Sequence, residues 1–298
     1  AARLATVYPG AIAISVFVLS EALFCPLMII HLICWVCAAR AESGRRAADW
    51  ALFGGAIAGV ATLTRPSWLL FVPFAGVMAI VAWPPRRRQL LIAGCLLIGV
   101  MIAMSPWWVR NYRVTGQFVP TTLQVGASLY DGLSPQATGA SNMDFVPRFY
   151  VEQKAADAAN PNLPGIFETR LSQRMRDASI QWAKAHPGQV LALMKTKFVR
   201  MWNLWPNAAQ FRSWKRRLII VVGYVPLMVM VLWGTWKYAR RGWSYVLCVM
   251  PAIYFTCLHL IFVSSLRYRQ PALLVGIVLA AAAIGGRSQG RKVEELKS

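Results

Sequence analysis

Long runs of uncharged apolar residues constrain this chain more than any other feature. A helix needs about 20 such residues to cross the hydrocarbon core of a bilayer. With 57% apolar residues in 298, the chain has more apolar surface than one soluble core of this length could bury. The sequence therefore predicts an all-α, polytopic membrane protein with about eight transmembrane helices, at residues 5–19, 22–39, 50–64, 67–84, 89–106, 218–236, 243–263 and 271–286.

The formal net charge of +21 would suggest nucleic acid as the partner of a soluble protein. Here much of the charge lies in short clusters just beyond apolar runs, where basic residues set membrane topology. If the eight spans alternate, four of these clusters fall on one side, which should be the cytoplasm: residues 40–46, 86–88, 237–241 and 287–292. We therefore expect membrane lipid around the chain and no nucleic-acid partner.

The spans divide the chain into three parts. Residues 1–106 hold five predicted transmembrane helices, residues 107–216 form an exoplasmic or periplasmic loop domain, and residues 217–298 hold three more helices and a cytoplasmic tail. The loop domain is expected to be mainly helical, because apolar residues recur at helical spacing in two of its segments, residues 167–185 and 187–205. Glycine, proline, asparagine and alanine dominate residues 134–164, which predicts an irregular lid.

Several classes of protein are disfavoured by what the sequence lacks. All six cysteines fall inside apolar runs, which argues against a disulfide framework. No charged n-region or cleavage site indicates a signal peptide at the start of the chain. The sequence has no Walker loop, nucleophile elbow, His-Glu-x-x-His or Gly-x-Gly-x-x-Gly motif, so direct use of ATP is not expected.

Glu21 is a candidate catalytic residue because it lies at the outer end of a predicted span. A carboxylate at this depth costs several kcal/mol unless it is solvated, paired or bound to a metal. A structural interpretation is also open, since Ser20-Glu21 begins the next apolar segment and a carboxylate is favoured at a helix N-terminus.

Outward arginines are candidate anion-binding residues. Arg65 lies in a short turn closed by Pro66, and Arg267 and Arg269 lie at the mouth of the last span. Their guanidinium forks suit a phosphate, although snorkelling to lipid headgroups would also explain them. Tyr268 separates the last two arginines. His259 precedes them by about two helical turns, where a structural hydrogen bond is the alternative to a ligand contact.

The aromatic stretch that begins at Pro106 marks the exit from the fifth span. Its tryptophans suit an interfacial belt. Arg110 and Asn111 could hold a phosphate or a sugar hydroxyl, and Tyr130 would line the same pocket from the outer loop. Gly116 and Gly126 are expected to form tight turns.

Seven segments together resemble the membrane glycosyltransferases of the GT-C class that use lipid-linked sugars and include the protein O-mannosyltransferases and the lipid A aminoarabinose transferase. These segments are YP at 8–9, LSEALF at 19–24, GVATLTRP at 59–66, PWWVRNY at 106–112, GQFVP at 116–120, GASLY at 126–130 and RYRQP at 267–271. Their order and predicted outward placement over almost the whole chain carry the resemblance.

The resemblance implies a polyprenyl-phosphate-linked sugar donor and a protein or lipid acceptor on the exoplasmic face. Glu21 falls where the family has its second outward acidic residue, which helps to form the active site or a site for a divalent metal ion. Arg65 and residues 267–269 fall near the donor phosphate. The family's usual catalytic carboxylate, in its first outward loop, has no match here. Either an N-terminal portion precedes this sequence or the chain is an inactive remnant.

These observations predict an integral membrane glycosyltransferase, or its C-terminal portion, in a bacterial inner membrane with its site facing the periplasm or exterior. A transporter or flippase of lipid-linked or anionic substrates is the main alternative, and an inactive membrane scaffold is another. Transporters commonly show inverted repeats and polar groups near the bilayer midplane. The polar candidates of this chain lie instead at one face, and no internal repeat is seen.

Overall fold

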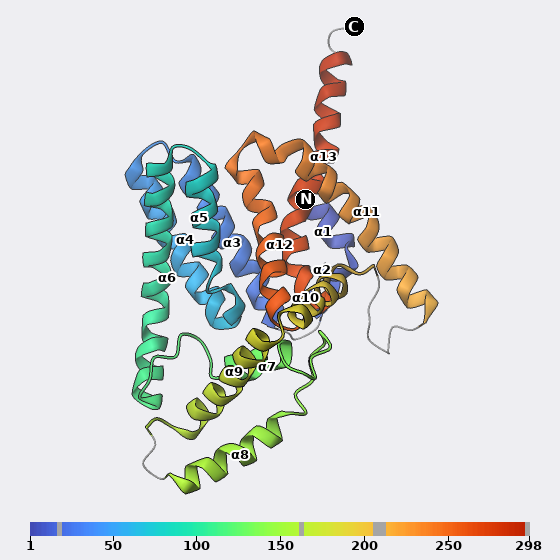
Figure 1. The fold of residues 1–298 in the computed structure, drawn as a ribbon. Coiled ribbons are helices and arrows are strands. Elements are labelled where there is room, and N and C mark those ends of the chain that lie inside the picture. Colours follow the sequence, from blue (N-terminus) through green and yellow to red (C-terminus); the bar gives the residue numbers. More distant parts are fainter. Residues whose placement is uncertain (17–19, 161–163, 205–212, 296–298) are drawn as a thin grey trace. The chain divides into compact units, whose positions relative to one another are not determined.

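The computed structural model of the chain describes residues 1–16, 20–160, 164–204 and 213–295 (Figure 1). These residues are all-helical and include no strand, which confirms the predicted all-α class. The chain forms two compact units. Unit 1 comprises Ala1–Ala103, Asn203–Phe255 and Arg269–Ser298, and unit 2 comprises Met104–Trp202 and Thr256–Tyr268.

Unit 1 contains the apolar helices. Five helices of the chain are long and apolar enough to cross a membrane, counting by length and composition over the described residues, and they indicate an integral membrane protein. The predicted count of eight spans stays a prediction, and the first predicted span runs into residues 17–19, outside the described ones. The elements of unit 1 are α1 (Ala2–Val7), α2 (Pro9–Val16), α3 (Ser20–Arg40), α4 (Gly44–Thr64), η1 (Pro66–Trp68), α5 (Phe71–Ala82), the first part of α6 (Arg86–Thr115), α11 (Trp214–Tyr238), η3 (Ala239–Arg241), and most of α12 (Trp243–Ile261) and α13 (Leu266–Glu295).

Small residues bring α4 close to its neighbours on both sides (Figure 1). A Cβ atom on Gly55 would come 2.1 Å from the carbonyl oxygen of Leu96 in α6, and one on Gly54 would come 2.8 Å from Cβ of Cys34 in α3. In lipid, helices associate through such close packing because the hydrophobic effect does not drive them together. The glycines of α4 therefore hold α3, α4 and α6 side by side.

Unit 2 contains the end of α6, α7 (Val125–Gly132), α8 (Val146–Ala159), α9 (Phe167–Ala185), α10 (Pro187–Trp202) and the short segment Thr256–Tyr268. The prediction of helices at residues 167–185 and 187–205 is confirmed for α9 and, as far as Trp202, for α10, whereas Trp205 lies outside the described residues. The prediction of an irregular lid at residues 134–164 was wrong in part, because α8 occupies its second half. Phe149 and Gln153 are the buried residues that attach this helix to α9.

The fifth predicted span was expected to end at residue 106, but α6 continues to Thr115. Pro106 lies inside the helix. The helix ends where Gly116 adopts a left-handed φ of +69° and donates its N–H to the carbonyl oxygen of Tyr112 at 2.9 Å. The tight turn predicted at Gly116 is thus confirmed.

The tight turn predicted at Gly126 was wrong. This glycine lies in α7, where an added Cβ would come 1.9 Å from the carbonyl oxygen of Ser172 in α9. Its role is therefore to let α7 pack closely against α9. The apolar core of unit 2 lies beside this contact and is formed by Ala127, Tyr130, Phe145, Phe149 and Met175.

A buried lysine joins α10 to the end of α12 within unit 2. The side chain of Lys197 is fully buried, and its Nζ donates to the carbonyl oxygens of Leu260 at 3.1 Å and Ile261 at 2.6 Å. The last carbonyls of a helix have no partner inside that helix, and a cation there also suits the helix dipole. Burial lowers the pKa of Lys197 to about 8, an effect that the negative charge of Asp131 opposes.

Candidate functional site

Glu21 and Arg65 meet because α3 and α4 form a helical hairpin. Glu21 lies in the first turn of α3, and Arg65 follows the last residue of α4. Only residues 41–43 connect the two helices, so they run antiparallel and the start of α3 lies beside the end of α4. The backbone of Arg65 is extended, with φ of −144°, as expected for the residue before Pro66.

The two side chains form a buried ion pair. Nη1 of Arg65 lies 2.6 Å from Oε1 of Glu21, and the two side chains are 9% and 0% exposed. Nε of Arg65 donates to Oγ of Ser67 at 3.2 Å, and Oγ of Ser20 lies 3.4 Å from Oε2 of Glu21. Removing two charges from water costs several kcal/mol each, so this pair persists only because each charge compensates the other.

Aromatic rings surround this pair. The guanidinium of Arg65 lies over the ring of Phe24, 5.7 Å from its centroid, and Phe24 packs edge-on against Trp68 at 5.4 Å and Phe255 at 6.2 Å. Such surroundings have a low dielectric, which strengthens the attraction between Glu21 and Arg65 and would equally strengthen their attraction to a third charged group. Chemically, the arrangement can hold an anion next to Arg65 or a hydroxyl proton next to Glu21.

Arg269 is a second buried cation of unit 1. The residue is 1% exposed, its guanidinium lies 3.7 Å from the ring centroid of Tyr224 in α11, and its Nη1 donates to the carbonyl oxygen of Asn203 at 2.5 Å. The next residue, Gln270, accepts a hydrogen bond from the hydroxyl of Tyr8 at 2.6 Å. The start of α13 is thus tied to α11 and to the residue between α1 and α2.

The predicted site residues not yet described all belong to unit 2. Arg110 is exposed, lies 5.0 Å from the ring centroid of Trp107 and donates to Oδ1 of Asn111 at 3.1 Å. Asn111 is buried, and its Nδ2 donates to the carbonyl oxygen of Val119 at 3.1 Å. The amide of Asn111 therefore holds the segment after α6 against the end of that helix.

His259 and Tyr268 stack on each other, with ring centroids 4.1 Å apart and planes 3° from parallel. Nδ1 of His259 donates to the carbonyl oxygen of Val263 at 2.8 Å. Arg267 is exposed next to them. The stack fixes the segment between α12 and α13, and Arg267 extends from that fixed segment.

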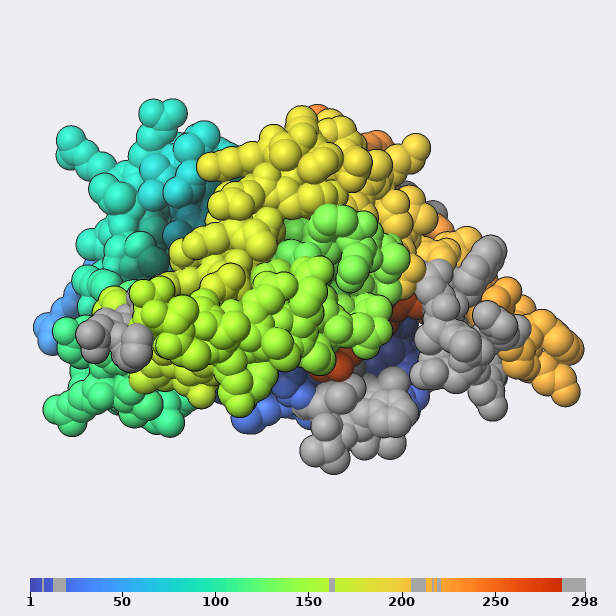
Figure 2. Space-filling model, turned by 60° about the horizontal axis from the view of Figure 1, so that its bottom comes forward, coloured from blue at the N-terminus to red at the C-terminus, as the bar shows by residue number. Residues whose placement is uncertain are grey.

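Tyr130 differs from the other predicted residues because it lines a cavity. Its ring packs in the apolar core of unit 2, and its hydroxyl accepts a hydrogen bond from Nη2 of Arg148 at 3.1 Å. The cavity measures about 660 Å³ and lies along α8 and α9. Figure 2 shows α8 in yellow-green and α9 and α10 in yellow on the face turned forward.

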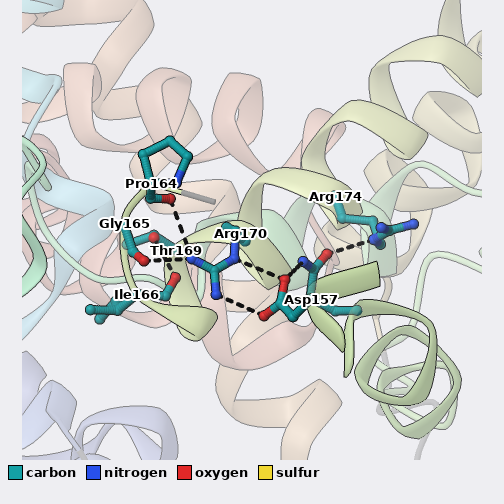
Figure 3. A network of polar contacts seen from close by, with 8 residues as sticks. Asp157, Pro164, Gly165, Ile166, Thr169, Arg170 and Arg174 are labelled. Carbon is teal, nitrogen blue, oxygen red and sulfur yellow. Dashed lines mark hydrogen bonds and ion pairs between the residues drawn. The ribbon is translucent and has the colours of Figure 1, made fainter. Parts of the chain in front are cut away.

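A polar network beside this cavity was missed by the sequence analysis (Figure 3). Arg170 binds Asp157 in a bidentate manner: its Nε donates to Oδ1 at 3.0 Å and its Nη2 donates to Oδ2 at 2.7 Å. Gln153 donates to Asp157 at 2.7 Å and accepts from Nε of Arg174 at 2.7 Å. The hydrogen bonds from Arg170 lower the pKa of the Asp157 carboxyl. The spacing of four residues between Gln153 and Asp157 and between Arg170 and Arg174 could have indicated the two helix faces that carry this network, had α8 been predicted.

Neither a disulfide nor a metal cluster is found among the described residues. All six cysteines are free, and nowhere in the described ranges do three or more histidine, cysteine, aspartate or glutamate side chains gather. No family model matches the chain, and comparisons with curated proteins and with solved structures find no match either.

Proposed function

We propose that this chain is an integral membrane glycosyltransferase, or its C-terminal portion, that transfers a sugar from a polyprenyl-phosphate donor to a protein or lipid acceptor on the exoplasmic face. The observation that carries the proposal is the ion pair between Glu21 and Arg65, buried in an apolar helical unit. Ionisable residues within membrane segments are rare and mark substrate sites by default.

The reaction would be a direct displacement at the anomeric carbon of the sugar. The acceptor oxygen forms a bond to that carbon, the bond from carbon to the phosphate oxygen breaks, and its electron pair leaves with the lipid phosphate. The acceptor hydroxyl gives its proton to a carboxylate. Negative charge that develops on the phosphate needs fixed cations in a site of low dielectric, which favours buried arginines.

In this proposal Arg65 binds the donor phosphate and Glu21 binds the acceptor or a divalent metal ion. Their mutual contact at 2.6 Å is the resting arrangement, in which each charge is neutralised until a substrate anion competes for Arg65. The resemblance also assigns Arg267 and Arg269 to the donor phosphate. Arg110, Asn111, Tyr130, His259 and Tyr268 are the further candidates for substrate binding. Their hydrogen bonds and stacking contacts, all within unit 2, favour roles in positioning that unit's own segments.

Sugar transfer in reconstituted liposomes tests the proposal. Purified chain is supplied with radiolabelled polyprenyl-phosphate sugars and a membrane extract as the source of acceptor, and labelled acceptor is counted. We expect donor-dependent transfer, and we expect Arg65→Lys, Glu21→Gln and Arg267→Ala to reduce it at least about tenfold, each equivalent to about 1.4 kcal/mol of transition-state stabilisation. Arg87→Lys, at an exposed position near the start of α6, is the matched control.

Two outcomes would contradict the proposal. Transfer that is unchanged in the Glu21 and Arg65 variants would remove these residues from the site. Movement of labelled lipid across the bilayer without any transfer to acceptor would favour a flippase.

A further inference from the structure

The cavity along α8 and α9 has the size and the walls of a ligand site. Its volume of about 660 Å³ lies within the range of roughly 300–1,000 Å³ that is typical of small-molecule sites. Its lining comes from unit 2 alone, mainly from α8 and α9, with Tyr130 from α7.

The charges that line the cavity nearly balance. Three arginines, Arg148, Arg170 and Arg174, face two carboxylates, Glu152 and Asp177. Arg170 is compensated by Asp157, and Asp177 by Arg176, so the excess of positive charge is a single unit, too little for a polyanion. The abundance of charged and amide groups equally disfavours an apolar ligand.

Both hydrogen-bond donors and hydrogen-bond acceptors line the cavity, and other side chains hold several of them in place. Gln153 is buried and held between Asp157 and Arg174. Because Nε of Arg174 is the one atom of its guanidinium bonded within the described part of the chain, its terminal nitrogens remain available as donors. Gln173 and Gln181 add amides that both donate and accept. Such a mixture suits a ligand whose groups both donate and accept, as hydroxyls do.

An aromatic wall completes the cavity. Trp182 lines it and is held in place by stacking on His186, with ring centroids 5.4 Å apart and planes 21° from parallel. Phe149 lines it from the apolar core and packs against Tyr130, 4.8 Å between centroids. Rings of this kind offer a flat apolar surface beside polar groups, which matches the face of a sugar ring.

We propose that this cavity binds a short, neutral oligosaccharide. The inference deepens the proposed function, on which it rests, since the oligosaccharide would be the carbohydrate part of a glycosylated acceptor. Arg174 and Gln181 would hydrogen-bond to neighbouring hydroxyls, and Trp182 would cover one sugar ring. The balanced charge selects neutral sugars over sulfated or phosphorylated ones.

Direct binding measurements test this inference without any turnover. The full chain in lipid nanodiscs is titrated calorimetrically with mannotriose, maltotriose and triacetylchitotriose, and with a heparin tetrasaccharide as the polyanion. We expect at least one neutral trisaccharide to bind. Trp182→Ala, Arg174→Ala and Gln181→Ala should each weaken its affinity about tenfold, which is the loss of about 1.4 kcal/mol.

Lys184→Ala is the matched control, because Lys184 is exposed on the same helix two residues from Trp182 and does not line the cavity. It should change the affinity less than about twofold, on the same scale. If Arg174→Ala lowers the melting temperature, its weaker binding could reflect lost folding. Gln181→Ala then tests the site, since Gln181 is exposed and its loss leaves the polar network intact.

Three results would overturn the inference. These are no binding of any trisaccharide up to about 10 mM, which corresponds to a binding free energy weaker than about −2.7 kcal/mol, binding of the heparin tetrasaccharide alone, or equal affinities in wild type and cavity variants. Failure of the proposed function would look different. A chain that binds the trisaccharide but transfers no sugar keeps this site and loses the enzyme.

Discussion

Two ion pairs in this chain have nearly the same length and very different surroundings. Arg65 meets Glu21 at 2.6 Å in unit 1, and Arg170 meets Asp157 at 2.7 Å in unit 2. The first pair is 9% and 0% exposed among aromatic rings, whereas the second is 19% and 20% exposed in a network that also holds Gln153. Because burial and not distance sets what a charge pair costs and contributes, we assign the first pair to chemistry and the second to holding α8 against α9.

The largest effect is expected from breaking the buried pair. Arg65→Met leaves the Glu21 carboxylate buried without its guanidinium and should lower the free energy of unfolding by about 3–5 kcal/mol. The double variant Glu21→Leu, Arg65→Met should recover most of that loss, since an apolar pair needs no compensation. Unfolding by denaturant in mixed micelles measures both. A double variant as unstable as the single one would show that other contacts of Glu21 and Arg65 dominate.

The second-largest effect is expected at Lys197, a buried charge of unit 2 that is bonded to carbonyl oxygens and not to a carboxylate. Lys197→Met removes the donor to the carbonyl oxygens of Leu260 and Ile261 and should cost about 1–3 kcal/mol. Hydrogen exchange of residues 256–264 measures it. The exposed Lys195→Met, on the same helix, should stay within about 0.5 kcal/mol of wild type. Equal exchange in the two variants would show that Lys197 does not stabilise the end of α12.

The same lysine should give unit 2 a dependence on alkaline pH. Burial lowers the pKa of Lys197 to about 8 from its ordinary 10.5, so between these values the unfolded chain binds a proton that the folded chain has released. Stability contributed by this residue must therefore rise as the pH increases from about 8 to about 10.5. Unfolding titrations of wild type and Lys197→Met across this window should diverge accordingly. A difference that shrinks as the pH rises would contradict the burial of a protonated lysine.

The smallest effect is expected at the pair of Arg170 and Asp157, whose side chains are 19% and 20% exposed. Arg170 lowers the pKa of the Asp157 carboxyl, so the stability that the charged form adds is present above the ordinary aspartate pKa and is lost as the pH falls through the lowered value. Asp157→Asn should destabilise less than Lys197→Met, and the loss should shrink in high salt. Thermal unfolding with Asp144→Asn as the exposed control measures it. A loss as large as that of Arg65→Met would erase the contrast between the pairs.

Local sequence was sufficient to predict much of the helical structure. The helix at residues 167–185 was predicted with the bounds of α9, because amphipathic spacing and the following Pro187 define it. Helix α8 was missed because its two buried anchors give little periodicity, and packing on α9 stabilises it. The close approach of Gly126 to Ser172 was also missed, since it depends on which helices become neighbours.

The site shows the same division between local and distant information. Glu21 and Arg65 were each identified by a charge at the end of an apolar run, and a short connection between α3 and α4 could have predicted their pairing. The stacking of Arg269 on Tyr224 joins helices distant in the sequence, and no local pattern specifies it. The network of Arg170 and Asp157 required knowledge of α8.

The central claim is that the buried pair of Glu21 and Arg65 serves sugar transfer and not stability alone. The most direct measurement is donor-dependent transfer by the double variant Glu21→Leu, Arg65→Met in liposomes, with its folding confirmed by unfolding in the same lipid. The account predicts a folded protein whose transfer falls by at least about a hundredfold, equivalent to about 2.7 kcal/mol. A folded double variant that transfers sugar at the wild-type rate would contradict it.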